Sequence, residues 1–184
     1  MLAVASRRAK REAVRSRYGE SAPLLDVTSR GAEPWVRFSP FYPHGEIPVP
    51  FSPGVYSHTV EGIWQGLKVF TTADVDPSKF EITTMRGLKR SARQYGPVLG
   101  HRAGVTGGRL LPYAQARQAI YLPSYRWLLE HRLRHLLNDL RQMARDQTVV
   151  LLDYETNGDV CDVTRPLSHA WLVKHYVDGT WPTP

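Results

Sequence analysis

Residues 56–70 read YSHTVEGIWQGLKVF, and this stretch indicates how the middle of the chain folds. Ser57 or Thr59 is suited to cap a helix that we expect over about residues 58–70. One face of this predicted helix is apolar and is expected to pack on a core. The residues of that face are Val60, Ile63, Trp64, Leu67 and Phe70.

Two further groups of residues lie on the other sides of the predicted helix. Gly62 and Gly66 fall together, and a pair without side chains lets a second backbone come close. Glu61, Gln65 and Lys68 fall in the remaining sector, with Glu61 and Lys68 two turns apart, about 10 Å along the axis. Polar groups on a helix packed on two sides need partners or a ligand. This row is therefore either a binding site or an ordinary solvated stripe.

The remaining patterns predict a single, helix-rich α+β domain with a small β-sheet. Residues 24–28 (LLDVT) and 148–153 (TVVLLD) are short apolar runs that we expect to be buried strands. A loop rich in proline and aromatic residues over 30–55 is expected to be packed and functional. Further helices are expected over residues 4–17, 85–96, 112–121, 123–145 and 166–177.

The positive charge is concentrated at the start of the chain. The formal net charge is +7, and residues 1–17 hold six basic side chains against the single acid Glu12. We therefore predict a basic N-terminal helix or arm over 1–17, followed by one domain over 18–184. This segment is either a solvated amphipathic helix or an arm that attracts nucleic acid or a polyphosphate ligand. Its basic residues are Arg7, Arg8, Lys10, Arg11, Arg15 and Arg17.

Composition argues against several classes of protein. No apolar run approaches the ~20 residues of a membrane span, so we expect no membrane partner. We recognise no signal peptide, and the single Cys161 fits a reducing compartment, so we expect a cytoplasmic protein. No cysteines and histidines are spaced as in a zinc site, and we expect no metal and no cofactor. The oligomeric state stays open.

Three segments resemble the signature of the NADAR (YbiA-like) family. They are FSPFYP at 38–43, YS at 56–57 and VEGIWQGLK at 60–68. That family shows L-S-N-F-Y-P, a loop, and then Y-x-S-V-E-x-x-x-Q-x-x-K, with the same order and spacing. The resemblance implies a NADAR-like fold and places Glu61 and Lys68 as catalytic residues. It makes candidate binding residues of Ser39, Phe41, Tyr42, Tyr56, Trp64, Gln65, Lys89 and Arg90.

The resemblance implies an N-glycosidase that hydrolyses a base–ribose bond in a nucleotide or an ADP-ribose-like compound, including ADP-ribosylated DNA or RNA. The transition state of such a reaction builds positive charge on the ribose. Glu61 is suited to stabilise that charge, to activate water or to protonate the leaving nitrogen. Lys68 is suited to bind a phosphate or to attack the anomeric carbon. Trp64, Phe41 and Tyr42 are suited to stack on the base, and Gln65 to orient hydroxyl groups.

The chain departs from the NADAR pattern near its end, where we find no D-x-x-W-G motif. The acidic loop DYETNGDVCD (153–162) stands at a similar distance, and Asp153 and Asn157 are its candidate site residues. Its alternative interpretation is a turn with solvated acids. The whole chain also resembles a set of uncharacterised bacterial and phage proteins that carry SPFYPHG, LLDY-x-TN and PLSHA.

Two more residues are candidates for phosphate binding. His101 and Arg102 lie in the glycine-rich segment GPVLGHRAG, whose backbone amides are suited to cradle a phosphate. The alternative to an enzyme is a non-catalytic protein that binds nucleic acid or a nucleotide. Its contact surface would be the basic arm and the region of Lys89, Arg90 and Arg93.

Overall fold

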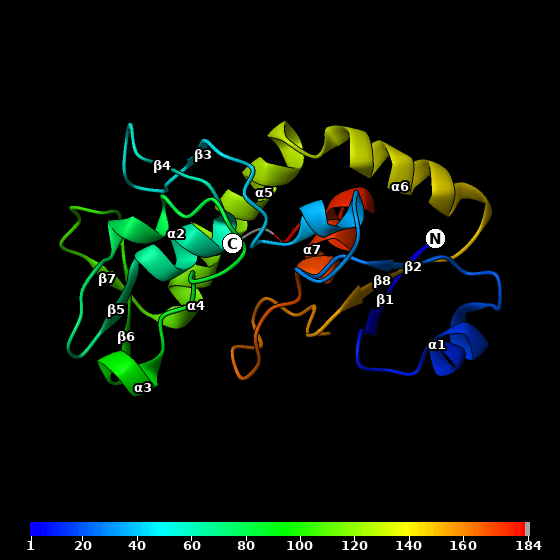
Figure 1. Ribbon diagram of the computed structural model, residues 1–184, viewed down its shortest axis with the longest axis horizontal. Helices are drawn as coiled ribbons and strands as arrows, with labels where there is room; N and C mark the ends of the chain where they lie inside the picture. Colours follow the sequence, from blue (N-terminus) through cyan, green and yellow to red (C-terminus); the bar gives the residue numbers. More distant parts are fainter. Residues whose placement is uncertain (183–184) are drawn as a thin grey trace. The chain divides into compact units, whose positions relative to one another are not determined.

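The computed structural model describes residues 1–182 and has the mixed α+β architecture that the sequence predicts (Figure 1). The chain forms two compact units. Unit 1 combines Met1–Ser39 with the described residues from Leu133 onward, and unit 2 is Pro40–Arg132. The basic segment 1–17 is thus part of unit 1. The last two residues of the domain expected over 18–184 lie outside the described residues.

Unit 1 is built on a parallel sheet of three strands in the order β1-β8-β2. These strands are β1 (Leu2–Ser6), β8 (Val149–Asp153) and β2 (Leu24–Asp26). Every residue of the central strand β8 is buried, because helices cover both faces of a parallel sheet. The two strands expected over 24–28 and 148–153 are confirmed.

Three α-helices and a short 3-10 helix (Trp35–Phe38) complete the part of unit 1 that the structure describes (Figure 1). Helix α1 (Arg11–Tyr18) packs through Val14 on a cluster that includes Val150 and Leu152. Helices α6 (Arg134–Asp146) and α7 (His169–Val177) also contact β8. Among the described helices, none is both long and apolar enough to cross a membrane.

The helices expected over 4–17, 123–145 and 166–177 differ from the sequence prediction. The helix expected over 4–17 starts only at Arg11, because residues 2–6 pair with β8 along their whole length. The helix expected over 123–145 is broken at Arg132 and Leu133, which separates α5 (Leu122–His131) from α6. The last helix starts at His169 instead of residue 166, because the side chain of Ser168 caps it.

Unit 2 surrounds the short helix α2 (Val60–Gly66). An antiparallel sheet in the order β5-β6-β7 and a two-stranded ribbon of β3 and β4 accompany α2. Helix α4, a π-helical turn and α5 follow one another without a break, which confirms the helix expected over 112–121. The bounds are β3 (Ile47–Pro48), β4 (Tyr56–Ser57), β5 (Lys68–Phe70), β6 (Val98–Arg102), β7 (Leu110–Leu111), α4 (Tyr113–Ala116) and the π-helical turn Arg117–Tyr121.

Two predicted helices of unit 2 are shorter than expected. The helix expected over 58–70 ends at Gly66, and Lys68–Phe70 becomes β5, because Val69 and Phe70 favour a strand that pairs with β6. Lys68 therefore leaves the helix and does not lie two turns from Glu61. In the segment expected to be helical over 85–96, only α3 (Ala92–Tyr95) forms.

The glycine face predicted for α2 is confirmed. A Cβ atom on Gly62 would lie 2.6 Å from the carbonyl oxygen of Lys79, and one on Gly66 would lie 2.3 Å from the ring of Phe80. Both distances are shorter than any side chain tolerates, so the segment that ends at Phe80 lies directly on the helix. This contact buries α2 on a second side, away from its apolar face.

Replacing Gly66 with alanine should destabilise the protein by about 1–3 kcal/mol, because the new methyl group overlaps the buried ring of Phe80. Gly108→Ala is the matched control, since nothing lies within 4 Å of its added Cβ. Urea unfolding followed by tryptophan fluorescence measures both variants. An unchanged midpoint for Gly66→Ala would show that α2 and Phe80 are not in close contact.

Candidate functional site

The amide of Gln65 connects three polar groups in unit 2. Its nitrogen Nε2 donates to Oε1 of Glu61 at 2.8 Å, one helical turn earlier. Its oxygen Oε1 accepts from Nζ of Lys68 at 3.2 Å and from the backbone N–H of Arg90 at 3.1 Å. The row Glu61–Gln65–Lys68 expected from the sequence is therefore present, although Lys68 reaches it from β5.

Glu61 lies in the first turn of α2, where the helix dipole favours a negative charge. Its side chain is buried, at 8 % exposure. Its backbone N–H donates to the carbonyl oxygen of Pro40 at 2.8 Å, so the proline-rich loop lies against the start of the helix. Thr59 caps the helix as expected and accepts from the N–H of Gly62 at 2.7 Å.

Lys68 is half-buried beside this carboxylate. Burial lowers the pKa of its amine, and the positive charges of Arg90 and Lys89 lower it further, while Glu61 opposes the shift. Its ammonium group lies 6.0 Å from the centre of the Trp64 ring. A lysine with a lowered pKa is a better nucleophile or proton acceptor near neutral pH than an ordinary lysine.

An aromatic cluster surrounds Trp64. The ring of His101 lies 3.7 Å from it, and Tyr113 and Tyr121 meet it edge-on at 5.7 and 5.6 Å. His101 is fully buried, and burial together with the charge of Lys68 lowers its pKa to about 3. The imidazole is therefore neutral at physiological pH. His101 supports Trp64 from inside the unit and is closed to solvent.

Arg90 belongs to the frame of the site. Its guanidinium donates to the carbonyl oxygens of Lys68 at 2.6 Å and Asp74 at 2.7 Å, and it lies over the ring of Phe70. The guanidinium also donates to the carbonyl oxygen of Gln65 near the end of α2. Arg90 thus connects the end of α2 and the strand β5 to the segment at Asp74. Lys89, next to it, is exposed and lies 5.6 Å from the ring of Phe41.

The loop residues expected to bind substrate have different surroundings. Phe41 and Tyr42 are partly exposed, and Tyr42 packs against His44 at 4.8 Å. Tyr56 in β4 is the most accessible, at 54 % exposure. Ser39 is buried and belongs to unit 1.

Arg102, a candidate for phosphate binding, has a carboxylate partner. It makes a two-point ion pair with Asp74, with distances of 3.0 and 2.8 Å, and also donates to the carbonyl oxygen of Gly108. The segment expected to be a phosphate loop contributes the strand β6. Arg102 thus links the end of β6 to the segments at Asp74 and Gly108 within unit 2.

Asp153, the first residue of the acidic loop, is the centre of a buried network in unit 1. Its Oδ2 accepts from Oγ of Ser168 at 2.7 Å and from the N–H of Ala170 at 3.3 Å, and it lies 3.0 Å from Nδ1 of His169. Nε2 of His169 is 2.8 Å from the carbonyl oxygen of Val27. Both ring nitrogens face acceptors, which is the arrangement of a charged imidazolium.

The pKa values of this pair agree with that assignment. Burial raises the pKa of Asp153, but the charge and hydrogen bond of His169 outweigh it and bring the value to about 2. Burial lowers the pKa of His169, and Asp153 outweighs this effect, so the net pKa is raised. The pair joins the end of β8 to the start of α7.

Asn157 organises the acidic loop. Its amide nitrogen donates to the carbonyl oxygens of Asp162 and Arg165, and its oxygen accepts from the N–H of Asp159. The amide is thus occupied by its own loop. Within residues 1–182, no three His, Cys, Asp or Glu side chains are grouped to hold a metal ion.

The sequence interpretation missed the aromatic partners of Trp64. Tyr113, Arg117, Tyr121 and Tyr125 recur every four residues, which places them on one face of a helix. Arg117 is fully buried and donates to the hydroxyl of Tyr113 at 3.0 Å. The spacing was visible in the sequence, but nothing in it indicated that Trp64 would be the neighbour.

A comparison with known families gives one result. The model of a family described as "Family of unknown function (DUF6939)" matches residues 6–173. No curated protein matches the chain. No solved structure matches it.

The Asp153–His169 pair should give unfolding a characteristic pH dependence. The pKa of Asp153 is lower in the folded protein than its value of about 3.9 in the unfolded chain. Its carboxylate therefore stabilises the fold above about pH 3.9, and this stability is lost as the pH falls toward 2. The raised pKa of His169 contributes stability below about pH 6.5, which is lost as the pH rises through the folded value. We expect the free energy of unfolding to be greatest between about pH 4 and 6.5.

Asp153→Asn should cost about 3 kcal/mol or more at pH 6, because it leaves His169 buried without a counter-charge. It should also abolish the loss of stability above pH 6.5. Asp178→Asn, at the exposed pair with Lys174 on the end of α7, is the matched control and should retain the wild-type profile. Urea unfolding across the pH range measures all three proteins, and a wild-type profile in Asp153→Asn would contradict the assignment.

Proposed function

This chain belongs to the family of unknown function DUF6939, and we propose that it hydrolyses an N-glycosidic bond in a nucleotide or ADP-ribose-like substrate. The observation that carries the proposal is the linked row in which a buried Glu61 is joined through Gln65 to a half-buried Lys68 of lowered pKa. Buried carboxylates and amines with shifted pKa values are concentrated at catalytic sites.

The chemistry of the row suits this reaction. Water adds its oxygen to the anomeric carbon while the carbon–nitrogen bond breaks. The electron pair of that bond leaves with the base, and the proton lost by the water ends on the leaving nitrogen. The sugar becomes positively charged on the way, and a carboxylate beside it stabilises that charge or takes the proton of the water. The hydrogen bond from Gln65 to Oε1 fixes the orientation of the Glu61 carboxylate.

Lys68 supplies the second function. Its amine lies within reach of the same amide, and its lowered pKa increases the fraction of neutral amine at a given pH. In the proposal it either binds a substrate phosphate as an ammonium or attacks the anomeric carbon as an amine. The terminal amino groups of Arg90 donate to backbone carbonyls, and this holds β5, from which Lys68 projects.

Aromatic side chains near the row support a substrate that contains a base. Trp64 is partly exposed and precedes Gln65 on α2, and Phe41 lies beneath the ammonium group of Lys89. A base stacks on such rings, and a nearby lysine suits a phosphate. The resemblance of FSPFYP and VEGIWQGLK to the NADAR signature supports the same substrate class, and the proposal includes a cytoplasmic location.

Glu61→Gln should lower kcat/KM at least 100-fold with the fold intact, because the amide can neither stabilise the cationic sugar nor accept a proton. The measurement is mass spectrometry of NAD, ADP-ribose, 5-phosphoribosyl aminopyrimidine and ADP-ribosylated guanine oligonucleotide after incubation with the protein. Glu81→Gln, which removes an exposed carboxylate of the same unit, is the matched control and should retain full activity.

Lys68→Arg separates the two roles of the lysine. It keeps a positive charge but has no neutral form, so it should retain activity if the ammonium binds phosphate and lose it if the amine attacks. Absence of base release from every substrate by the folded wild-type protein would refute the proposal. Binding without turnover, weakened strongly by salt, would identify a nucleic-acid-binding protein instead.

A further inference from the structure

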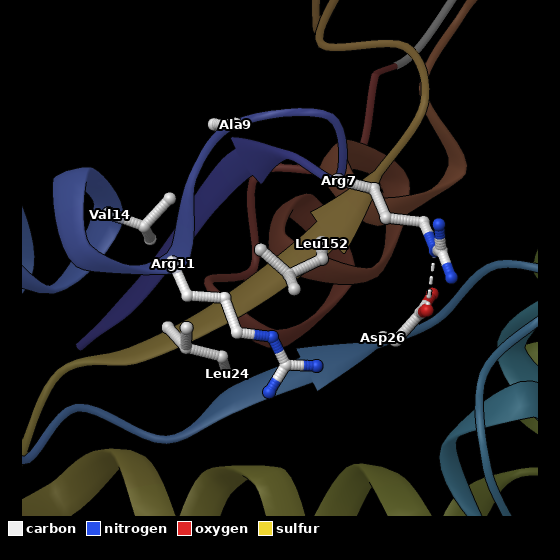
Figure 2. A pocket seen from close by; sticks show the side chains of 7 residues that line it. All are labelled: Arg7, Ala9, Arg11, Val14, Leu24, Asp26 and Leu152. Atoms are coloured by element: carbon white, nitrogen blue, oxygen red, sulfur yellow. Dashed lines mark hydrogen bonds and ion pairs between the residues drawn. The ribbon is translucent and has the colours of Figure 1, made fainter.

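A second candidate site lies in unit 1, at the edge where the parallel strands end. A pocket of about 170 Å³ opens between the segment after β1, the start of α1 and the end of β2 (Figure 2). We propose that it binds the phosphate group of a small phosphate ester. Its lining residues are Arg7, Ala9, Arg11, Val14, Leu24, Asp26 and Leu152.

The position suits a ligand. Arg7 follows β1, Leu152 lies in β8 and Asp26 ends β2, so all three stand at the carboxyl ends of parallel strands. In open α/β sheets, ligands bind at this edge, where loops lead from strands into helices. The segment from Arg7 to Lys10 is such a loop, and it leads directly into α1.

The pocket has an excess of positive charge, because Arg7 and Arg11 outnumber Asp26, the one acid among its lining residues, and both oxygens of that acid have partners. Oδ1 of Asp26 accepts from the N–H and the hydroxyl of Thr28 at 3.0 and 2.6 Å. Oδ2 accepts from Nε of Arg7 at 2.6 Å. Within residues 1–182 the Arg7 side chain makes this one hydrogen bond, through Nε. Its two terminal amino groups therefore remain available as donors to a ligand.

Arg11 is the second cation. Its side chain makes no hydrogen bond and no ion pair within residues 1–182, and Figure 2 shows it extending along the pocket toward β2. A guanidinium with free donors matches the oxygen atoms of a phosphate. Arg11 is also the first residue of α1, whose capping residue Lys10 supplies no side-chain hydrogen bond to the first turn.

Size and lining restrict the ligand to a small molecule. Sites for drug-sized ligands usually measure about 300–1,000 Å³, so 170 Å³ is too small for a complete nucleotide with its base. Val14, Leu24 and Leu152 give the pocket an apolar wall, which a sugar ring or a short carbon chain can contact. A pentose phosphate has the required charge and dimensions.

This inference is independent of the proposed glycosidase, since it uses residues of unit 1 alone. Isothermal titration calorimetry with ribose 5-phosphate, inorganic phosphate and uncharged ribose tests it. We expect ribose 5-phosphate to bind, phosphate to bind more weakly and ribose not to bind. Arg11→Gln should weaken the binding of ribose 5-phosphate about 10-fold or more.

Arg15→Gln is the matched control, because it removes an exposed charge from the same helix without touching the pocket. It should change the affinity less than about twofold, since only a screened long-range charge is lost. Glu61→Gln should bind as the wild type does, which separates this test from that of the glycosidase. Equal effects of Arg11→Gln and Arg15→Gln, equal binding of ribose, or no binding of ribose 5-phosphate at 10 mM would each overturn the proposal.

Discussion

The side-chain amide of Gln65 determines the geometry of unit 2 around α2. An amide has one donor end and one acceptor end, and here Glu61 occupies the donor end while Lys68 and Arg90 occupy the acceptor end. The orientation of the amide is therefore fixed by its partners. If the amide turned over, it would present its oxygen to a carboxylate and its nitrogen to a cation, and neither contact would be favourable. Three elements, α2, β5 and the segment at Arg90, are held in register by this one group.

The constraint behind this interaction is that buried polar groups must find partners. Unit 1 meets the same constraint with Asp153, whose carboxylate is satisfied by the start of α7 and by an imidazolium. The two sites differ in whether a hydrogen-bond donor remains available to a ligand. His169 uses both ring nitrogens inside unit 1, whereas Lys68 is only half-buried and keeps donor capacity. For this reason our proposal uses the row in unit 2 for chemistry and not the network in unit 1.

Local sequence patterns predicted the mixed α+β class, the strands at 24–28 and 148–153, the cap at Thr59 and the glycine face of α2. Each of these follows from residues close in the chain. The strand at Leu2–Ser6 could not be predicted, because its partner lies near residue 150 and its own residues also fit a helix. The end of α2 at Gly66 was missed for a related reason, since the preference of Val69 and Phe70 for a strand depends on β6. The row Glu61–Gln65–Lys68 was predicted in composition but not in geometry.

The pairing of β1 with β8 has a consequence for how the protein is made. The central strand of unit 1 leaves the ribosome about 150 residues after β1, so at a synthesis rate of ~5–20 residues per second β1 waits roughly 7–30 seconds for its partner. Unit 2 is one continuous segment, Pro40–Arg132, and its contacts can form during that interval. Until then, the nascent chain exposes an unpaired apolar strand, which is the kind of segment that ribosome-associated chaperones protect.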